Sequence, residues 1–152
     1  LPRAFLVGRS LLGREPQLLN TYYSESFDPR KEVLLGEEVP IQTRSDFSGQ
    51  VKKILYSPNK VRLLTEQNGE GFLVLLDTYF PGWKVEVDGK SASIYRANYF
   101  YRGVKLNAGH HVVEFSYTPE GLKTGLTISI LTLVALLAGL IFFYIKNLRK
   151  ER

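Results

Sequence analysis

The pattern of hydrophobic and polar positions divides this chain into two unequal parts. Up to about residue 122, short apolar or alternating runs are separated by proline, glycine, asparagine and aspartate. From Thr124 to Ile145 the chain then runs for 22 residues without a charge or a proline. The first pattern is typical of β-strands joined by turns, and the second is typical of a helix in an apolar environment.

The uncharged run is long enough to cross a membrane. Its 22 residues would form a helix of about 33 Å, against a hydrocarbon core of roughly 30 Å. The seven residues that follow, 146–152, contain four basic side chains and one acidic one, whereas only Lys123 lies close on the other side. The positive-inside rule therefore predicts a transmembrane helix at 122–145, a cytoplasmic tail at 146–152 and an extracytoplasmic location for everything before Lys123.

A helix buried in a soluble core is the alternative interpretation of this run. The run is apolar on all faces, and the sequence contains no comparable helix that could bury it. We therefore favour a membrane span.

Residues 1–121 are predicted to form an antiparallel β-sandwich with one short helix at Glu15–Ser24. Turn signals recur every 8–12 residues, which is typical of sandwiches. Pro81-Gly82 and Asp88-Gly89 are the strongest turns, and 71–77 is apolar up to its last residue, Asp77, as expected of a central strand buried on both faces. The eight or nine expected strands are residues 3–8, 32–35, 51–56, 60–66, 71–77, 83–88, 91–96, 100–106 and 111–117.

Charge and composition exclude several classes of partner and site. The net charge of +5 is uneven, because residues 1–123 carry 16 basic and 14 acidic side chains. The near-neutral sandwich argues against a nucleic-acid partner, which requires a basic face. The absence of cysteine excludes disulfides and thiolate metal sites. Because the chain has no methionine and no signal peptide, we expect a piece of a longer membrane protein whose other helices deliver the sandwich across the membrane.

Isolated polar residues give weak functional signals. His110 and His111 are neighbours in a strand and should point to opposite faces, so we expect no shared metal. Asp88 is explained by its turn. Asp77 ends the buried strand, and a buried carboxylate needs a partner, for which Arg96 or Arg102 is available. The alternative for Asp77 is a role in ligand binding.

Aromatic residues are dense between positions 79 and 101, where seven of them occur close to Arg96 and Arg102. Two interpretations remain open: packing in the core or at a membrane interface, and contact with a carbohydrate or a lipid phosphate. The sequence predicts no catalytic residue, no metal site and no cofactor. The candidate binding residues are Asp77, Tyr79, Trp83, Arg96, Tyr99, Tyr101 and Arg102.

Five segments in order along the chain together resemble the C-terminal region of YfhO-family bacterial membrane proteins. Phe80 stands where tyrosine is more familiar in that family. The segments are LPRAFLV (1–7), FDPRKEVLL (27–35), DTYFPGWKVEVDG (77–89), YRANYFYRGV (95–104) and AGHHVVEFSYTP (108–119).

The resemblance implies an accessory extracytoplasmic domain and the last membrane helix of a GT-C-type glycosyltransferase in the bacterial cytoplasmic membrane. Such an enzyme transfers sugar from a polyprenyl-phosphate donor to a cell-surface polymer such as lipoteichoic acid. Its catalytic carboxylates lie in loops among N-terminal membrane helices, so no catalytic residue carries over. The family positions present here are expected to be structural: Pro81, Gly82, Trp83, Asp88, Gly89, Arg96, Asn98, Arg102 and Gly103.

The partners implied by the resemblance are the lipid bilayer, the N-terminal membrane domain of the same protein, and a glycan or a polyprenyl-phosphate sugar. The alternative is a membrane-anchored carbohydrate-binding or structural module without catalysis.

Overall fold

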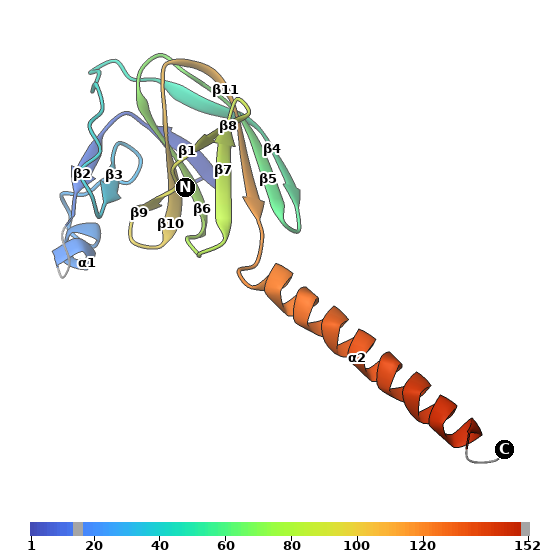
Figure 1. The fold of residues 1–152 in the computed structure, drawn as a ribbon. Helices are drawn as coiled ribbons and strands as arrows, with labels where there is room; N and C mark the ends of the chain where they lie inside the picture. Colours follow the sequence, from blue (N-terminus) through green and yellow to red (C-terminus); the bar gives the residue numbers. More distant parts are fainter. Residues whose placement is uncertain (14–16, 150–152) are drawn as a thin grey trace. The chain divides into compact units, whose positions relative to one another are not determined.

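The computed structural model describes residues 1–13 and 17–149. The chain forms two compact units, residues 1–118 and residues 119–152. The first unit contains all the described strands and one short helix, α1 (Gln17–Tyr22), and the second contains helix α2 (Leu122–Leu148). Figure 1 shows the order of these elements. The strands are β1 (Ala4–Val7), β2 (Ser10–Leu12), β3 (Val33–Leu35), β4 (Gly49–Ser57), β5 (Lys60–Gln67), β6 (Gly71–Thr78), β7 (Trp83–Val87), β8 (Lys90–Ala92), β9 (Tyr95–Ala97), β10 (Tyr101–Leu106) and β11 (Gly109–Tyr117).

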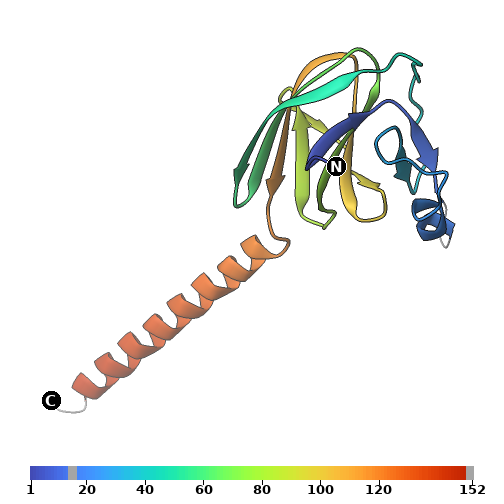
Figure 2. The same cartoon turned by 180° about the vertical axis from the view of Figure 1, so that it is seen from behind.

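Two sheets make up the first unit. The six-stranded sheet has the order β1-β6-β10-β9-β3-β2, and the five-stranded sheet has the order β4-β5-β11-β7-β8. Their strands pair antiparallel except for β2 and β3, which are parallel. Views from opposite sides show the sheets as two layers (Figures 1 and 2). The predicted β-sandwich is therefore confirmed.

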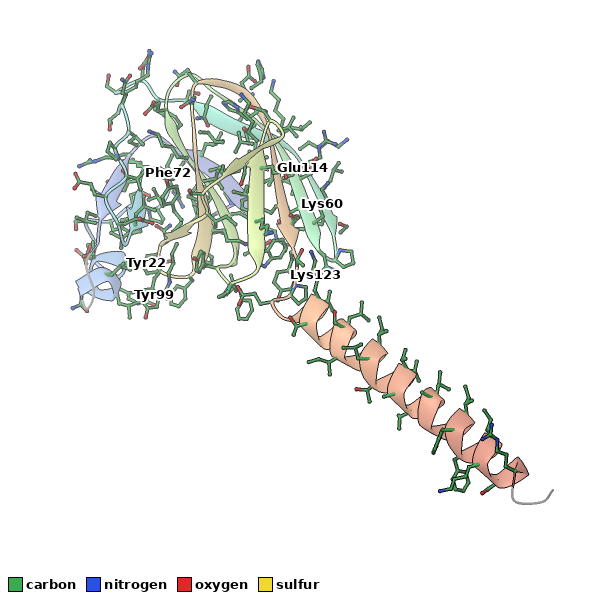
Figure 3. All side chains as sticks on the ribbon, in the orientation of Figure 1. Tyr22, Lys60, Phe72, Tyr99, Glu114 and Lys123 are labelled. Carbon is green, nitrogen blue, oxygen red and sulfur yellow. The ribbon has the colours of Figure 1, made fainter. Side chains whose placement is uncertain are left out.

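The core lies between the two layers because inward-facing residues of both sheets form one cluster. Leu73 and Leu75 of β6 contribute from one sheet, and Val113 and Phe115 of β11 from the other, all of them inaccessible to solvent. Strand β6 is buried on its other face as well, where Phe72 packs in a second cluster with Val7 and Val33 among others (Figure 3). The uninterrupted apolar run of 71–77 thus reflects burial on both faces, as predicted.

The outer face of the six-stranded sheet is covered locally. Val39 and Ile41, from the connection between β3 and β4, pack on the cluster that contains Phe72. Leu18 of α1 packs with Phe27 and Leu34. The predicted helix at 15–24 is confirmed for Gln17–Tyr22, while Glu15 and Pro16 lie outside the described residues.

The structure corrects two details of the expected strands. Residues 91–96 do not form one strand, because β8 pairs with β7 in one sheet whereas β9 pairs with β10 in the other. The chain changes sheets between Ala92 and Tyr95, which interrupts the pairing. Strand β2 was not predicted, since three residues are too few to show a periodicity.

Helix α2 carries the apolar run. A stretch of 26 residues, Leu122–Asn147, is long and apolar enough to cross a membrane, and none of its most hydrophobic window is buried within the structure. Residues 150–152 of the predicted tail lie outside the described residues.

Candidate functional site

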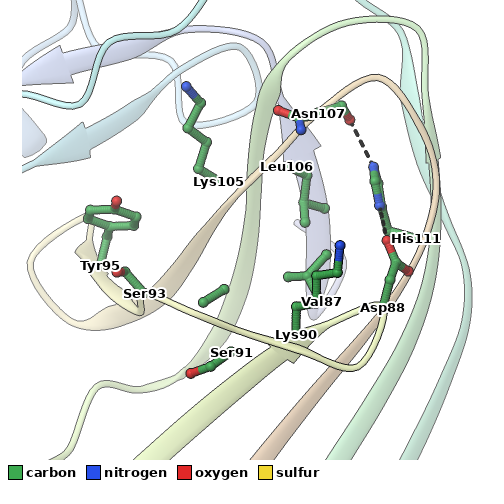
Figure 4. Close-up of a pocket in the computed structure, with 11 residues that line it drawn as sticks. Val87, Asp88, Lys90, Ser91, Ser93, Tyr95, Lys105, Leu106, Asn107 and His111 are labelled. Atoms are coloured by element: carbon green, nitrogen blue, oxygen red, sulfur yellow. Dashed lines mark hydrogen bonds and ion pairs between the residues drawn. The ribbon is translucent and has the colours of Figure 1, made fainter.

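A polar groove opens between the β7–β8 hairpin and the strand pair β9–β10. It has a volume of about 500 Å³. Figure 4 shows Asp88, His111 and Asn107 on one side of it and Tyr95 and Ser93 on the other. Its lining residues are Val87, Asp88, Lys90, Ser91, Ala92, Ser93, Tyr95, Lys105, Leu106, Asn107 and His111.

The β7–β8 turn forms one rim of the groove. Asp88 and Gly89 have φ angles of 53° and 76°, as a two-residue type I′ turn requires. The chain then passes from one sheet to the other, and Ser91, Ser93 and Tyr95 follow the groove along this crossing. The local sequence thus places three hydroxyl groups along one wall.

Asp88 joins the two turns that border the groove. Its Oδ2 lies 2.7 Å from Nδ1 of His111, and its Oδ1 accepts the Val112 N–H at 2.8 Å. Nε2 of His111 lies 3.1 Å from the carbonyl oxygen of Asn107. The hydrogen bond with His111, followed by the one from Val112, lowers the pKa of Asp88. This carboxylate is therefore fixed as an anion that holds the rim in place.

The two lysines of the groove differ in their partners. Nζ of Lys105 donates to the carbonyl oxygen of Pro40 at 2.7 Å and pairs with Glu70 at 3.2 Å. Its charge is therefore already paired with residues of two neighbouring loops. Lys90 is exposed beside Asp88. Of the two lysines, Lys90 is the one placed to meet an anion in the groove.

Tyr95 gives the groove an aromatic wall. Its ring meets Phe72 edge-on, with centroids 5.7 Å apart and planes at 83°, and it stays partly exposed. A ring of fixed orientation, several hydroxyls, the Asn107 amide and one ammonium are the groups that a polar, hydroxyl-rich ligand needs.

The residues predicted from the sequence as binding residues lie elsewhere and form separate clusters. In the first, Nη2 of Arg102 donates to Oδ2 of Asp77 at 2.9 Å, and Nε of Arg3 donates to Oδ1 at 3.0 Å. The guanidinium carbon of Arg102 lies 3.8 Å from the ring centroid of Trp83 and 5.3 Å from that of Phe115. Of the two arginines considered, Asp77 thus pairs with Arg102, together with Arg3.

The arginine at the centre of this first cluster is shielded from solvent. Arg102 is 3% exposed, and burial lowers its pKa. Its Nε and Nη1 atoms are inaccessible to solvent and have no hydrogen-bond partner among the described residues. The cluster therefore connects the two sheets and stabilises the core, as the structural interpretation of Asp77 expects.

The second cluster is aromatic and lies around the β9–β10 turn. Arg96 stacks on the Tyr99 ring at 4.3 Å and donates from Nε to the Tyr99 carbonyl. Phe100 contacts the rings of Tyr99, Tyr101 and Tyr22 at centroid distances of 4.8, 6.2 and 6.4 Å. Burial, followed by the nearby Tyr101, raises the pKa of Tyr22.

Tyr79 joins this second cluster through the backbone. Its N–H donates to the Phe100 carbonyl at 2.7 Å, and its own side chain is 39% exposed. None of the seven predicted binding residues lines the groove.

Sequence analysis missed the groove because its key pair is long-range. From the sequence, Asp88 is explained by its turn and His111 by its place in a strand. They meet because the β7–β11 register pairs Val87 with Val113. The Asp-Gly turn was the usable signal, although the sequence does not reveal its pairing partner. His110 contacts Glu66 instead, at 3.3 Å, so the two histidines have different partners.

Comparison with known proteins identifies the family. The family described as "Bacterial membrane protein YfhO" matches residues 42–129, more than half of the chain. This chain belongs to the YfhO family. The matched region contains β4 to β11 and the start of α2. The segments LPRAFLV and FDPRKEVLL precede it.

A relative from Bacillus subtilis (strain 168), described as "Uncharacterized protein YfhO", is 27% identical over 95 residues. That alignment covers 62% of this chain and 10% of the relative, so the chain corresponds to about a tenth of the relative's length. No solved structure matches this chain.

Proposed function

We propose that this chain is the accessory extracytoplasmic domain and a membrane helix of a YfhO-type glycosyltransferase, and that its groove binds the acceptor polymer. Membership of a bacterial membrane protein family and the apolar helix α2 support the membrane location. The resemblance to GT-C-type proteins supplies the reaction, transfer of a sugar from a polyprenyl-phosphate donor to a cell-surface polymer.

The groove is the observation that carries this proposal. Its volume of about 500 Å³ suits one or two sugar units. Tyr95 offers a ring face for sugar C–H groups, while Ser91, Ser93 and Asn107 offer hydrogen bonds to hydroxyls. Lys90 adds a positive charge for the phosphate of a polymer such as lipoteichoic acid.

In this proposal the chain binds and orients the acceptor, and the transfer chemistry belongs to other parts of the protein. Asp88 holds the groove rim rather than moving a proton, because His111 and Val112 already occupy its two oxygens. A groove that binds without moving a proton is also consistent with the second candidate function, a membrane-anchored carbohydrate-binding module without catalysis.

An NMR titration of the chain in lipid nanodiscs tests binding. The probes are glycerol-phosphate oligomers with and without attached sugars, and neutral oligosaccharides. We expect the sugar-bearing oligomers to shift the amide signals of Lys90, Ser91, Tyr95 and Asn107. Lys90→Gln should weaken binding about tenfold, because a hydrogen bond to a charged group is lost. Lys84→Gln, on the outer face of β7, is the matched control and should leave affinity unchanged.

Binding without shifts at the groove would refute the proposed site. Transfer is tested in a strain lacking the gene, by measuring sugar on the cell-surface polymer after complementation with the full-length gene. Restored sugar with the natural gene and reduced sugar with Lys90→Gln support the glycosyltransferase. Binding without any transfer by the full-length protein supports the carbohydrate-binding module instead.

A further inference from the structure

Exposed aromatic side chains gather at one end of the sandwich, which we call the aromatic end. Figures 1 and 2 show the β4–β5, β6–β7 and β9–β10 turns and α1 at this same end. Its exposed rings are Tyr23 (75% exposed), Tyr56 (43%), Tyr79 (39%), Phe80 (58%) and Phe100 (41%).

Contacts link Tyr23, Phe100 and Tyr79 to one another. Tyr23 packs edge-on against Tyr22 at 5.2 Å, and Tyr22 in turn contacts Phe100. The backbone hydrogen bond from Tyr79 to Phe100 ties the β6–β7 turn to the β9–β10 turn. Arg3 lies 4.0 Å from the ring centroid of Tyr56.

The opposite end of the sandwich is polar. The turns there are residues 68–70, 88–90 and 107–109, with sequences NGE, DGK and NAG. Within the described part of the chain, none of the exposed large hydrophobic residues belongs to these three turns. The turns at both ends connect strands of the same two sheets. The difference between the ends therefore comes from the residues in the turns and not from the fold.

The fold itself does not require aromatic residues at these exposed positions. Phe80 contributes to none of the three core clusters, although its neighbours Pro81 and Gly82 complete the turn. Contiguous exposed apolar surface on a protein marks an interaction site. Tyrosine, which supplies three of the five exposed rings, is enriched at membrane–water interfaces, and the exposed side chain of Arg96 adds positive charge near anionic head groups.

We propose that the aromatic end inserts into the head-group region of a lipid bilayer. The position at which the chain leaves the sandwich supports a lipid bilayer as the partner. The N–H of Thr118 donates to the Gly82 carbonyl at 3.1 Å, so the sandwich ends at this aromatic surface. Only residues 119–121 separate Thr118 from the first residue of the membrane-spanning candidate α2 in the sequence.

Site-specific fluorescence in nanodiscs tests this contact. The chain contains no cysteine, so a single introduced cysteine can be labelled uniquely. Phe80→Cys places the label in the turn before β7, and Lys90→Cys places it at the first residue of β8, beside the polar turn that follows β7. These two positions form a matched pair on either side of one strand.

The nanodiscs contain phosphatidylglycerol and phosphatidylethanolamine, with a nitroxide quencher on the head group. We expect the label at position 80 to lose at least about half of its fluorescence and the label at position 90 to lose little, given the short range of interfacial contact. Tyr79→Cys provides a second position if the first variant does not fold, and circular dichroism checks the fold of each variant.

Equal quenching at positions 80 and 90 would overturn the proposal. So would a label at position 80 that is shielded from aqueous iodide but not quenched by the lipid, because a protein segment would then be covering the aromatic end. Greater lipid quenching at both 79 and 80 than at 90 supports the bilayer as the partner.

Discussion

Replacing the two partners of the buried ion pair separately should produce unequal losses of stability. Arg102 of β10 lies between the sheets, stacked on Trp83, and pairs with Asp77 of β6 at 2.9 Å. Asp77 also pairs with Arg3, whereas the Nε and Nη1 atoms of Arg102 have no partner among the described residues. Asp77 thus keeps a partner if Arg102 is removed, but Arg102 loses its only described carboxylate partner if Asp77 is removed.

This difference in partners determines how much stability each substitution should cost. Asp77→Ala leaves a guanidinium that is 3% exposed without its counter-charge, so unfolding free energy should fall by about 3–5 kcal/mol. Arg102→Met removes a charge that is already poorly hydrogen-bonded, and a linear apolar side chain of similar length still packs on Trp83 and Phe115. We expect this variant to lose less than about 2 kcal/mol or to gain stability.

Urea unfolding of the chain in nanodiscs measures both values. Trp83 is the single tryptophan, so its fluorescence reports on the sandwich alone. Arg102→Ala serves as the control for lost packing and should cost more than Arg102→Met. A larger loss for Arg102→Met than for Asp77→Ala would refute this reasoning. Glycan binding should stay unchanged in Arg102→Met, since Arg102 does not line the groove.

Substitutions at three further positions test the groove rim and the turns. The pKa of Asp88 is lowered in the folded state by His111, so its stabilising contribution is present above the unfolded pKa, near 4, and is lost as pH falls through the folded value. Asp88→Asn should therefore show a smaller drop in melting temperature between pH 5 and pH 3 than the natural chain, measured by calorimetry. Asn98 has a φ of 50°, and its Oδ1 accepts the Leu34 N–H at 2.8 Å. Asn98→Gly should lose about 1–3 kcal/mol in urea unfolding and Asn98→Ala about 1 kcal/mol more, and equal losses would contradict the role of φ. The buried amide of Gln67 donates to three backbone carbonyls at and near the β10–β11 turn. Gln67→Ala should lower stability by about 1–3 kcal/mol and weaken saccharide binding in the NMR titration.

Much of the fold follows from local chemistry in the sequence. Asp88-Gly89 and Pro81-Gly82 form turns as predicted, and Gly82 has a φ of 95° that a side chain would strain. The apolar run of β6 correctly indicates a central strand. The change of sheet after Ala92 was not predictable, because it depends on which strands lie beside β8 and β9 rather than on their own residues.

The site was less predictable than the fold for the same physical reason. The aromatic and arginine residues between 79 and 102 are open to two interpretations from the sequence, packing and ligand contact, and strand register divides them into separate clusters. Arg102 faces the interior together with Val104 and Leu106, because alternate residues of β10 share a face, and there it meets Asp77. Tyr79 and Tyr99 instead lie at the aromatic end. Sequence spacing alone does not encode this division.

The two proposals together constrain which substrate the groove would hold. Strand β11 extends from Gly109, near the groove, to Tyr117, beside the aromatic end. His111, the residue of β11 that lines the groove, precedes Tyr117 by roughly 20 Å at about 3.4 Å per residue. If the aromatic end lies among lipid head groups, the rim of the groove at Asp88 and His111 is held away from them, whereas Tyr95 lies nearer to them. The phosphate of a polyprenyl-linked donor stays at the head-group level, whereas a cell-surface polymer extends beyond it. The separation therefore favours the acceptor polymer over the lipid-linked donor as the ligand of the groove.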